Sequence, residues 1–138
     1  MLSSARTLLC AFLLAVAAAR AQCPVHTIIL KGHVENPAPN SRIRVHLSYP
    51  KQPSGESAEA SPQDGSFRLP IEFLTQSSKP LLTNLKPKCD RKPNTVVITL
   101  LTGDTEKSQM TLDFPRDFTM IDASAYTPRS EVVIKDTR

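Results

Sequence analysis

Hydrophobic and polar residues alternate along several short segments of this chain, and clusters of proline, asparagine, glycine and serine separate the segments. The clearest segment is residues 42–49, in which every second residue is apolar and the residues between are charged or polar. A period of two places successive side chains on opposite faces of a β-strand, so one face is expected in a core and the other in water. No long segment shows the 3.6-residue period of an amphipathic helix, and the pattern therefore predicts an all-β protein.

The same alternation predicts strands at residues 25–34, 42–49, 67–73, 95–101, 107–114, 117–121 and 130–135, with at most a short edge strand near 56–60 and a plain connection at 123–128. Residues 95–101 are almost continuously apolar, which is typical of a central strand buried on both faces. Gly103 and Asp104 should turn the chain, so that this strand and the next form a hairpin. Pro70 cannot donate to a strand ladder, and its strand is therefore expected either to lie at a sheet edge or to break at the proline.

The connection at residues 74–93 contains three prolines and shows no sustained period, so it is interpreted as a long crossover. A crossover of this length is typical of Greek-key topology. About seven strands at this spacing predict a single-domain Greek-key β-sandwich.

Residues 1–21 have the features of a secretory signal peptide. Arg6 provides a positive charge, residues 8–19 are apolar but too short to span a bilayer, and residues 19–21 form a small-x-small cleavage site. We therefore expect a secreted, extracellular protein whose domain is residues 22–138. A second apolar segment of membrane length and a lipid-anchor tail are not expected.

Cleavage would also settle the cysteine count, because Cys10 lies inside the signal peptide. Cys23 and Cys89 remain, and an oxidising compartment favours a disulfide between them. Closing the loop between Cys23 and Cys89 would stabilise the fold by about 4 kcal/mol in the chain-entropy model. Neither cysteine belongs to a C-x-x-C motif, so a redox role is not expected.

The charge balance excludes some partners. Removal of Arg6 and Arg20 lowers the formal net charge from +4 to +2, and no basic cluster is interleaved with aromatic residues. Nucleic-acid binding is therefore not expected. Removing 21 of the 138 residues leaves 117, which suits one domain with one core.

Five short elements follow a known family pattern: a Gly-x-Val strand end, a proline turn, an alternating strand, a small-residue strand and an Asp-Gly-x-Phe turn. They are Gly32-His33-Val34, residues 37–39, 43–47 and 58–61, and Asp64-Gly65-Ser66-Phe67. In these elements the chain resembles the transthyretin-like, carboxypeptidase-regulatory-like family of small β-sandwiches. The resemblance implies a sandwich that serves as a binding or accessory module, and no ligand residue of the family transfers. The small size, signal peptide and single disulfide also resemble small secreted proteins of filamentous fungi, some of which act as effectors on a host.

The candidate binding residues are basic. Arg42, Arg44 and His46 share one face of the second strand, and Lys88 and Arg91 flank Cys89. Such a surface could meet an acidic protein or an anionic surface. The alternative interpretation is that these residues form an ordinary strand face exposed to solvent, without a binding function.

Metal, cofactor and catalytic sites are not expected. His26 and His33 are seven residues apart and should point to opposite faces of their strand, and no close cysteine or carboxylate completes a zinc site. Asp113, Asp117 and Asp122 could only provide a carboxylate pair from turns, where carboxylates are ordinarily solvated. The sequence also lacks a Gly-x-Ser-x-Gly nucleophile motif.

Taken together, the residues predict a secreted, non-enzymatic binding protein, with an effector-like role on a host protein or surface. A carrier of a small apolar ligand is the first alternative, but the large inner residues Phe67, Phe73, Leu100 and Phe114 should fill the core. A small hydrolase is the second alternative.

Overall fold

The computed structural model describes residues 23–52, 55–75 and 89–136, so the predicted signal peptide lies outside the described residues. Within these ranges the regular structure is a set of β-strands. They are β1 (Val25–Glu35), β2 (Ser41–Ser48), β3 (Ser57–Ala60), β4 (Ser66–Leu74), β5 (Thr95–Thr102), β6 (Thr105–Asp113), β7 (Phe118–Asp122), β8 (Ala125–Pro128) and β9 (Val132–Lys135). No helix of the described ranges is long and apolar enough to cross a membrane.

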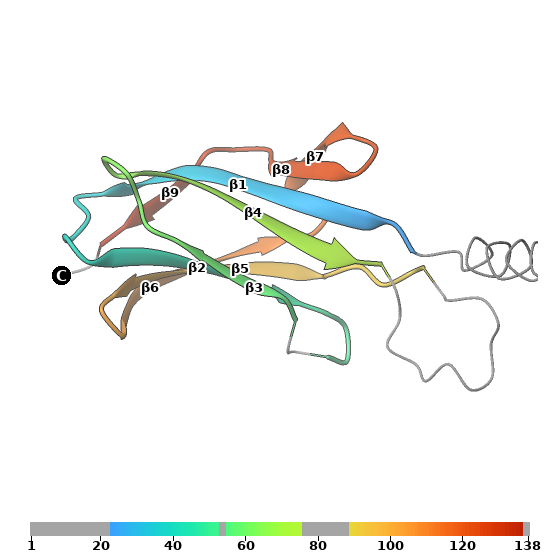
Figure 1. Ribbon diagram of the computed structural model, residues 1–138, viewed down its shortest axis with the longest axis horizontal. Coiled ribbons are helices and arrows are strands. Elements are labelled where there is room, and N and C mark those ends of the chain that lie inside the picture. The colour runs from blue at the N-terminus through green and yellow to red at the C-terminus, as the bar shows by residue number, and fades with distance from the viewer. Residues whose placement is uncertain (1–22, 53–54, 76–88, 137–138) are drawn as a thin grey trace, which may run out of the picture.

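The strands form two stacked sheets (Figure 1). Sheet A has the order β4-β1-β8-β7, and β9 also pairs with β1, beyond the end of β8. Sheet B has the order β3-β2-β5-β6. The predicted all-β sandwich is therefore confirmed. The connection from β4 to β5 passes from sheet A to sheet B, as expected for the long crossover.

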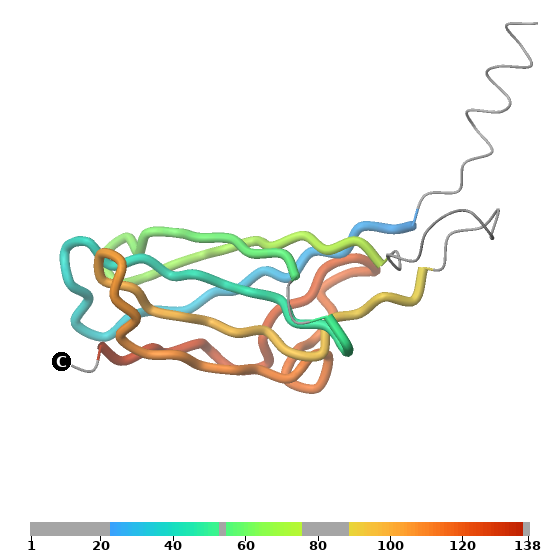
Figure 2. Tube along the Cα trace, turned by 90° about the horizontal axis from the view of Figure 1, so that it is seen from below, coloured from blue at the N-terminus to red at the C-terminus, as the bar shows by residue number. Residues whose placement is uncertain are grey.

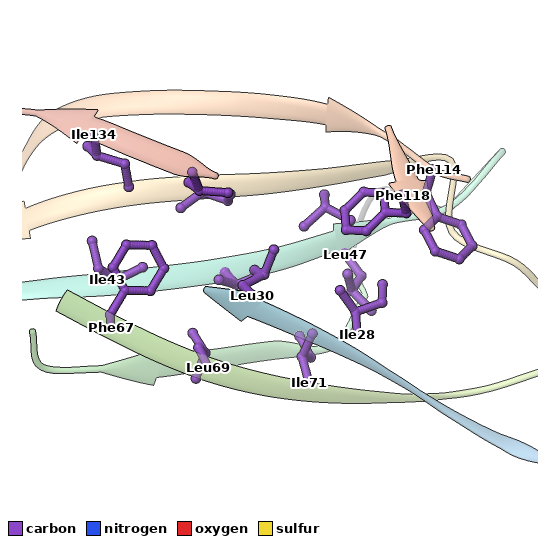
Figure 3. Close-up of a cluster of buried hydrophobic side chains, with 14 of the residues drawn as sticks. Ile28, Leu30, Ile43, Leu47, Phe67, Leu69, Ile71, Phe114, Phe118 and Ile134 are labelled. Carbon is purple, nitrogen blue, oxygen red and sulfur yellow. The ribbon is translucent and has the colours of Figure 1, made fainter. Parts of the chain in front are cut away.

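The core lies between the sheets and is built by the predicted alternation (Figure 3). β2 alternates strictly between buried and half-buried residues, and β4 between exposed and buried residues. The largest fully buried side chains are Ile28, Leu30, Ile43, Leu47, Ile98, Leu100 and Leu101. The large residues expected inside, Phe67, Phe73, Leu100 and Phe114, are all buried.

The two ends of the sandwich differ in their connections (Figure 1 and Figure 2). The turns after β1, β3 and β5 lie together at one end. At the other end, Cys23 and Cys89 form the predicted disulfide, with an Sγ–Sγ distance of 2.08 Å. Cys23 precedes β1 of sheet A and Cys89 precedes β5 of sheet B, so the disulfide links the segments that lead into these two strands.

One strand was not predicted from the sequence. Residues 123–128 were expected to be a connection, but β8 occupies Ala125–Pro128 and pairs with both β1 and β7. Tyr126 stabilises this short strand by packing edge-on against Phe114, with ring centroids 4.9 Å apart. All four residues of β8 are half-buried, so the strand shows no alternation between a core face and a solvent face.

Gly32 allows β9 to lie close to β1. It pairs with Val132, and a Cβ atom at Gly32 would lie only 2.1 Å from the carbonyl oxygen of Val132. Real Cβ atoms do not approach a carbonyl this closely, so a side chain at this position would displace β9. The Gly-x-Val element of the sequence therefore has a packing role in sheet A.

Candidate binding surfaces

The predicted basic residues of β2 lie on the outer face of sheet B, which is the face directed away from the core. Arg42 and Arg44 both bind Glu59 of the neighbouring strand β3. The Nε atom of Arg44 donates to Oε1 of Glu59 at 2.8 Å, and Nη1 of Arg42 donates to Oε2 at 2.9 Å. One carboxylate thus bridges two guanidinium groups.

Asp104 balances the second positive charge. Arg42 Nη2 donates to the carbonyl oxygen of Gly103 at 2.8 Å and lies 3.5 Å from Oδ1 of Asp104. The hydrogen bond from Arg44, together with the charges of both arginines, lowers the pKa of Glu59. Glu59 is therefore ionised at neutral pH, and the two arginines are matched by two carboxylates.

The arginines also lie beside a buried layer on this outer face. Leu101 and Thr99 are the direct cross-strand neighbours of Arg42 and Arg44, and they are 1% and 5% exposed. Long aliphatic stems of arginine can cover apolar surface while the charged group stays in water. The prediction that β5 is buried on both faces is thus confirmed in its centre, over Ile98–Leu101.

Arg91 lies away from Arg42 and Arg44, at the disulfide end. Its guanidinium carbon sits 3.6 Å from the ring centroid of Tyr49, and its Nη1 pairs with Glu56 at 3.2 Å. The Tyr49 hydroxyl donates to the same carboxylate. Tyr49 faces the core of sheet B, whereas Arg42 and Arg44 face outward, so Arg91 does not extend their surface. Lys88 lies outside the described residues.

Burial is the main cause that raises the pKa of Tyr49, and the hydrogen bond to Glu56 adds to it. The tyrosine therefore stays neutral and holds its hydrogen bond. The Arg91 amide donates to the Thr75 carbonyl oxygen at 2.7 Å. The Thr75 hydroxyl in turn donates to Pro24 O at 3.1 Å. This cluster fixes the chain around the disulfide and is occupied by its own contacts.

The outer face of sheet A carries a different arrangement. Lys31 of β1 and Arg68 of β4 lie directly opposite each other in the strand register, and both are exposed. Neither makes an ion pair with a carboxylate of the described residues. Like charges in direct cross-strand positions destabilise a sheet. The sequence analysis missed this pair because the residues are 37 positions apart in the sequence and only the register brings them together.

Apolar residues adjoin this basic pair. The next pair along the same face is Ile29 and Pro70, and beyond it lie the opposed residues Val25 and Leu74, which are 45% and 48% exposed. Between the basic pair and the end of the strands at Val25 and Leu74, Glu72 is the one carboxylate of β1 and β4. The face therefore combines two unmatched cations with exposed apolar side chains.

The histidines are dispersed. His26 stacks on Phe73 with ring centroids 5.5 Å apart, His33 pairs with Glu131 at 2.9 Å, and His46 contacts the Ser57 hydroxyl at 2.8 Å. In the part of the chain that the structure describes, no group of three or more potential metal ligands comes together.

The three aspartates considered for catalysis serve local structure. Asp117 accepts a hydrogen bond from the Asp113 amide at 2.7 Å, and this bond lowers the pKa of Asp117. Asp122 accepts from the Ser124 amide at 2.8 Å, which lowers the pKa of Asp122. Both carboxylates are thus engaged with backbone amides of their own turns.

The surface of the described ranges has hollows, of which two adjoin the strands discussed above. One, of about 630 Å³, lies among the turns after β1, β3 and β5 and includes Pro37, Arg42, Asp64 and Asp104 in its lining. The other, of about 420 Å³, lies between β6 and the β8–β9 connection.

No protein-family model matches this sequence, and comparison with curated proteins and with solved structures gives no match. The resemblance to the transthyretin-like family stays a prediction.

Proposed function

We propose that the protein is a secreted, non-enzymatic binding protein that recognises an acidic surface of another protein through the outer face of sheet A. The observation that carries this proposal is the opposed pair Lys31 and Arg68, two exposed cations without a carboxylate partner among the described residues. An acidic partner would supply the missing negative charge. The neighbouring apolar residues Val25 and Leu74 would lose their exposure in such a contact.

The arrangement on sheet B supports this choice of face. An acidic partner at Arg42 and Arg44 would compete with Glu59 and Asp104, which already bind both guanidinium groups. A partner at Lys31 and Arg68 displaces no such ion pair. Charge complementarity also speeds association and favours the correct partner more than it adds raw affinity.

The non-enzymatic part of the proposal rests on the carboxylates. Asp117 and Asp122 hold backbone amides of their own turns, and this local use leaves them poorly suited to act on a substrate. A panel of polysaccharide and ester substrates should show no turnover by the purified protein. Turnover that persists after further purification would contradict this part of the proposal.

The binding part is tested with two matched double charge reversals. Tagged wild-type protein, Lys31→Glu/Arg68→Glu and Arg42→Glu/Arg44→Glu are used to capture partners from a host or culture extract. We expect the wild type to capture a protein partner and Lys31→Glu/Arg68→Glu to lose it. Arg42→Glu/Arg44→Glu should still capture this partner, provided that the variant is folded.

Loss in the sheet B variant alone, with its fold intact, would instead support the basic residues predicted from the sequence. Equal capture by all three proteins would contradict a charged binding face. A separate experiment measures binding of the wild type to vesicles of neutral lipid with and without an anionic lipid. Binding that requires the anionic lipid would indicate that the partner is a membrane surface and not a protein.

A further inference from the structure

The edge of sheet B at β6 leaves backbone groups without partners in the described ranges. The Phe114 amide donates to Asn94 O at 2.9 Å, which fixes the alternation of hydrogen bonds between β5 and β6. In an antiparallel pair the backbone groups of successive residues point alternately toward and away from the partner strand. Met110 and Leu112 therefore bond to β5, whereas the N–H and C=O groups of Gln109 and Thr111 point to the open edge.

This open stretch has a defined limit. The Asp113 amide, which also points to the edge, donates to Asp117 Oδ2 at 2.7 Å, and the Asp113 carbonyl oxygen accepts from the Asp117 amide at 2.9 Å. At the other side, the pairing of β5 and β6 shifts between Leu100 and Leu101. The chain thus closes both sides of the edge and leaves a short open stretch around Gln109 and Thr111.

The other long edge is closed by a proline. The Val34 amide donates to Gly65 O at 2.7 Å, so the alternation places the nitrogen of Pro70 toward the free edge of β4. A proline nitrogen has no hydrogen to donate, and it blocks strand addition there. The remaining edge strands are short, because β3 and β9 have four residues each and β7 has five. Among the edge strands of the described ranges, β6 is therefore the long one whose backbone N–H and C=O groups remain open to a further strand.

A hollow with an apolar side at Met110 and Leu112 accompanies the open stretch. Met110 and Leu112 are half-buried, and they line the 420 Å³ hollow together with residues 128–132. In an added antiparallel strand, residues opposite Met110 and Leu112 would have their side chains on the same face as these two residues. They would cover the hollow.

The charges around the hollow favour one flanking group. Arg116 pairs with both Asp113 and Asp117, and Glu131 pairs with His33. Arg129 lines the hollow, and its Nε donates to Arg116 O at 3.0 Å. Its charge helps to lower the pKa of Asp117, which also lines the hollow, but no carboxylate oxygen of the described ranges forms an ion pair with it. A carboxylate beside the added strand could therefore pair with it directly.

We propose that β6 receives an extended segment of a partner protein. The segment forms backbone hydrogen bonds with Gln109 and Thr111 and buries alternate apolar side chains against Met110 and Leu112. A carboxylate of the segment pairs with Arg129. Addition of a strand to an open sheet edge is a general mode of peptide recognition, in which the main chain gives affinity and alternate side chains give specificity. This site is separate from Lys31 and Arg68 and does not depend on the function proposed for sheet A.

The decisive variant is Thr111→Pro. It removes an N–H group that points to the edge and leaves the bonds to β5 intact, and the native Pro70 shows that this fold accepts a proline in the equivalent position of an edge strand. The matched control is Thr111→Ala, which keeps the amide. Gln109→Pro is the second variant, should Thr111→Pro fail to fold.

The probe is a library of random twelve-residue peptides displayed on phage and selected on the secreted wild-type protein. We expect recovered peptides with apolar residues at alternate positions and an acidic residue at one side. Their Kd should rise about tenfold or more in Thr111→Pro, which corresponds to about 1.4 kcal/mol. Thr111→Ala should bind nearly as the wild type.

Hydrogen exchange of the wild type provides a measurement that needs no variant. The Gln109 and Thr111 amides should exchange quickly in the free protein and be protected when a selected peptide is bound. Failure to select any peptide, peptides that bind both proline variants like the wild type, or unchanged exchange at these two amides would overturn the proposal. A dimer in sedimentation that Thr111→Pro abolishes would also overturn it, because the occupant would then be a second copy of this chain.

Discussion

The outer faces of the two sheets use charge in opposite ways. On sheet B, the cations Arg42 and Arg44 bind Glu59 and Asp104 and lie beside the buried residue Leu101. On sheet A, Lys31 and Arg68 oppose each other across two strands, without a carboxylate partner among the described residues. Two half-buried arginines on sheet B thus have carboxylate partners, whereas two exposed cations on sheet A have none among the described residues.

This difference shows why a row of basic residues in a sequence is a weak guide to a binding surface. The alternating pattern correctly placed Arg42 and Arg44 on one face, but the partners that neutralise them come from β3 and from the turn after β5. Whether a cation can meet a partner protein depends on the strands beside it. The comparison makes sheet B a structural face and sheet A the proposed recognition face.

The largest expected effect serves as a reference because it should not distinguish the faces. Cys89→Ser removes the link between the segments that lead into β1 and β5, across a sequence separation of 66 residues. We expect the free energy of unfolding to fall by about 4 kcal/mol in the chain-entropy model. Denaturant unfolding measures this loss, and an unchanged midpoint would contradict a stabilising disulfide. Native Cys23 should be blocked or replaced by serine in the same protein to prevent new disulfides.

The next effect separates the faces by packing. Leu101→Ala should destabilise the protein by roughly 2–5 kcal/mol, because this outward-facing side chain is as buried as a core residue. Ile29→Ala, on the outer face of sheet A, should cost less because Ile29 is only half-buried. Urea unfolding of both variants provides the measurement. Equal losses would remove the structural distinction between the faces.

A smaller effect should differ in sign between the faces. Arg68→Glu converts a like-charge pair into an opposite-charge pair, and it should stabilise the protein by roughly 0.2–1 kcal/mol while it weakens binding of the acidic partner. Arg44→Glu places like charges beside Glu59 and should destabilise the protein. Thermal unfolding at low salt compares the two variants. Destabilisation by Arg68→Glu would show that its charge is already matched in the folded protein.

The smallest effect is the pH dependence of Glu59. Its pKa is lowered in the folded protein from an ordinary value of 4.5, so its contribution is fully present above that pH and is lost as the pH falls through the lowered folded value. The stability difference between wild type and Glu59→Gln should therefore shrink as the pH is reduced from 6 toward 3. Thermal midpoints across this range measure it. A difference that stays constant would contradict the ion pairs with the arginines.

The sequence predicted most of the strands because they are long enough to show alternation, as in β2 and β4. It also predicted the disulfide, since only two cysteines remain after removal of the signal peptide, and the edge position of the strand that contains Pro70. β8 was missed because its four residues are all half-buried and do not alternate between a core face and a solvent face.

The candidate sites were less predictable, for a physical reason. Alternation tells which face of its own strand a residue occupies, but only the register tells which residue of another strand lies opposite. The contacts of Arg44 with Glu59, and of Lys31 with Arg68, depend on registers that no local pattern contains. The open edge at Gln109 and Thr111 likewise depends on which strand occupies the end of sheet B.

The proline of β4 also limits how far molecules of this protein can assemble. Fibre growth by strand addition needs two open edges on each molecule, one to receive and one to offer. Pro70 closes one long edge, and β3 offers only four residues at the side of sheet B opposite β6. The remaining edge strands, β7 and β9, have five and four residues. Association through β6 therefore lacks a second long, open edge to which further copies could be added.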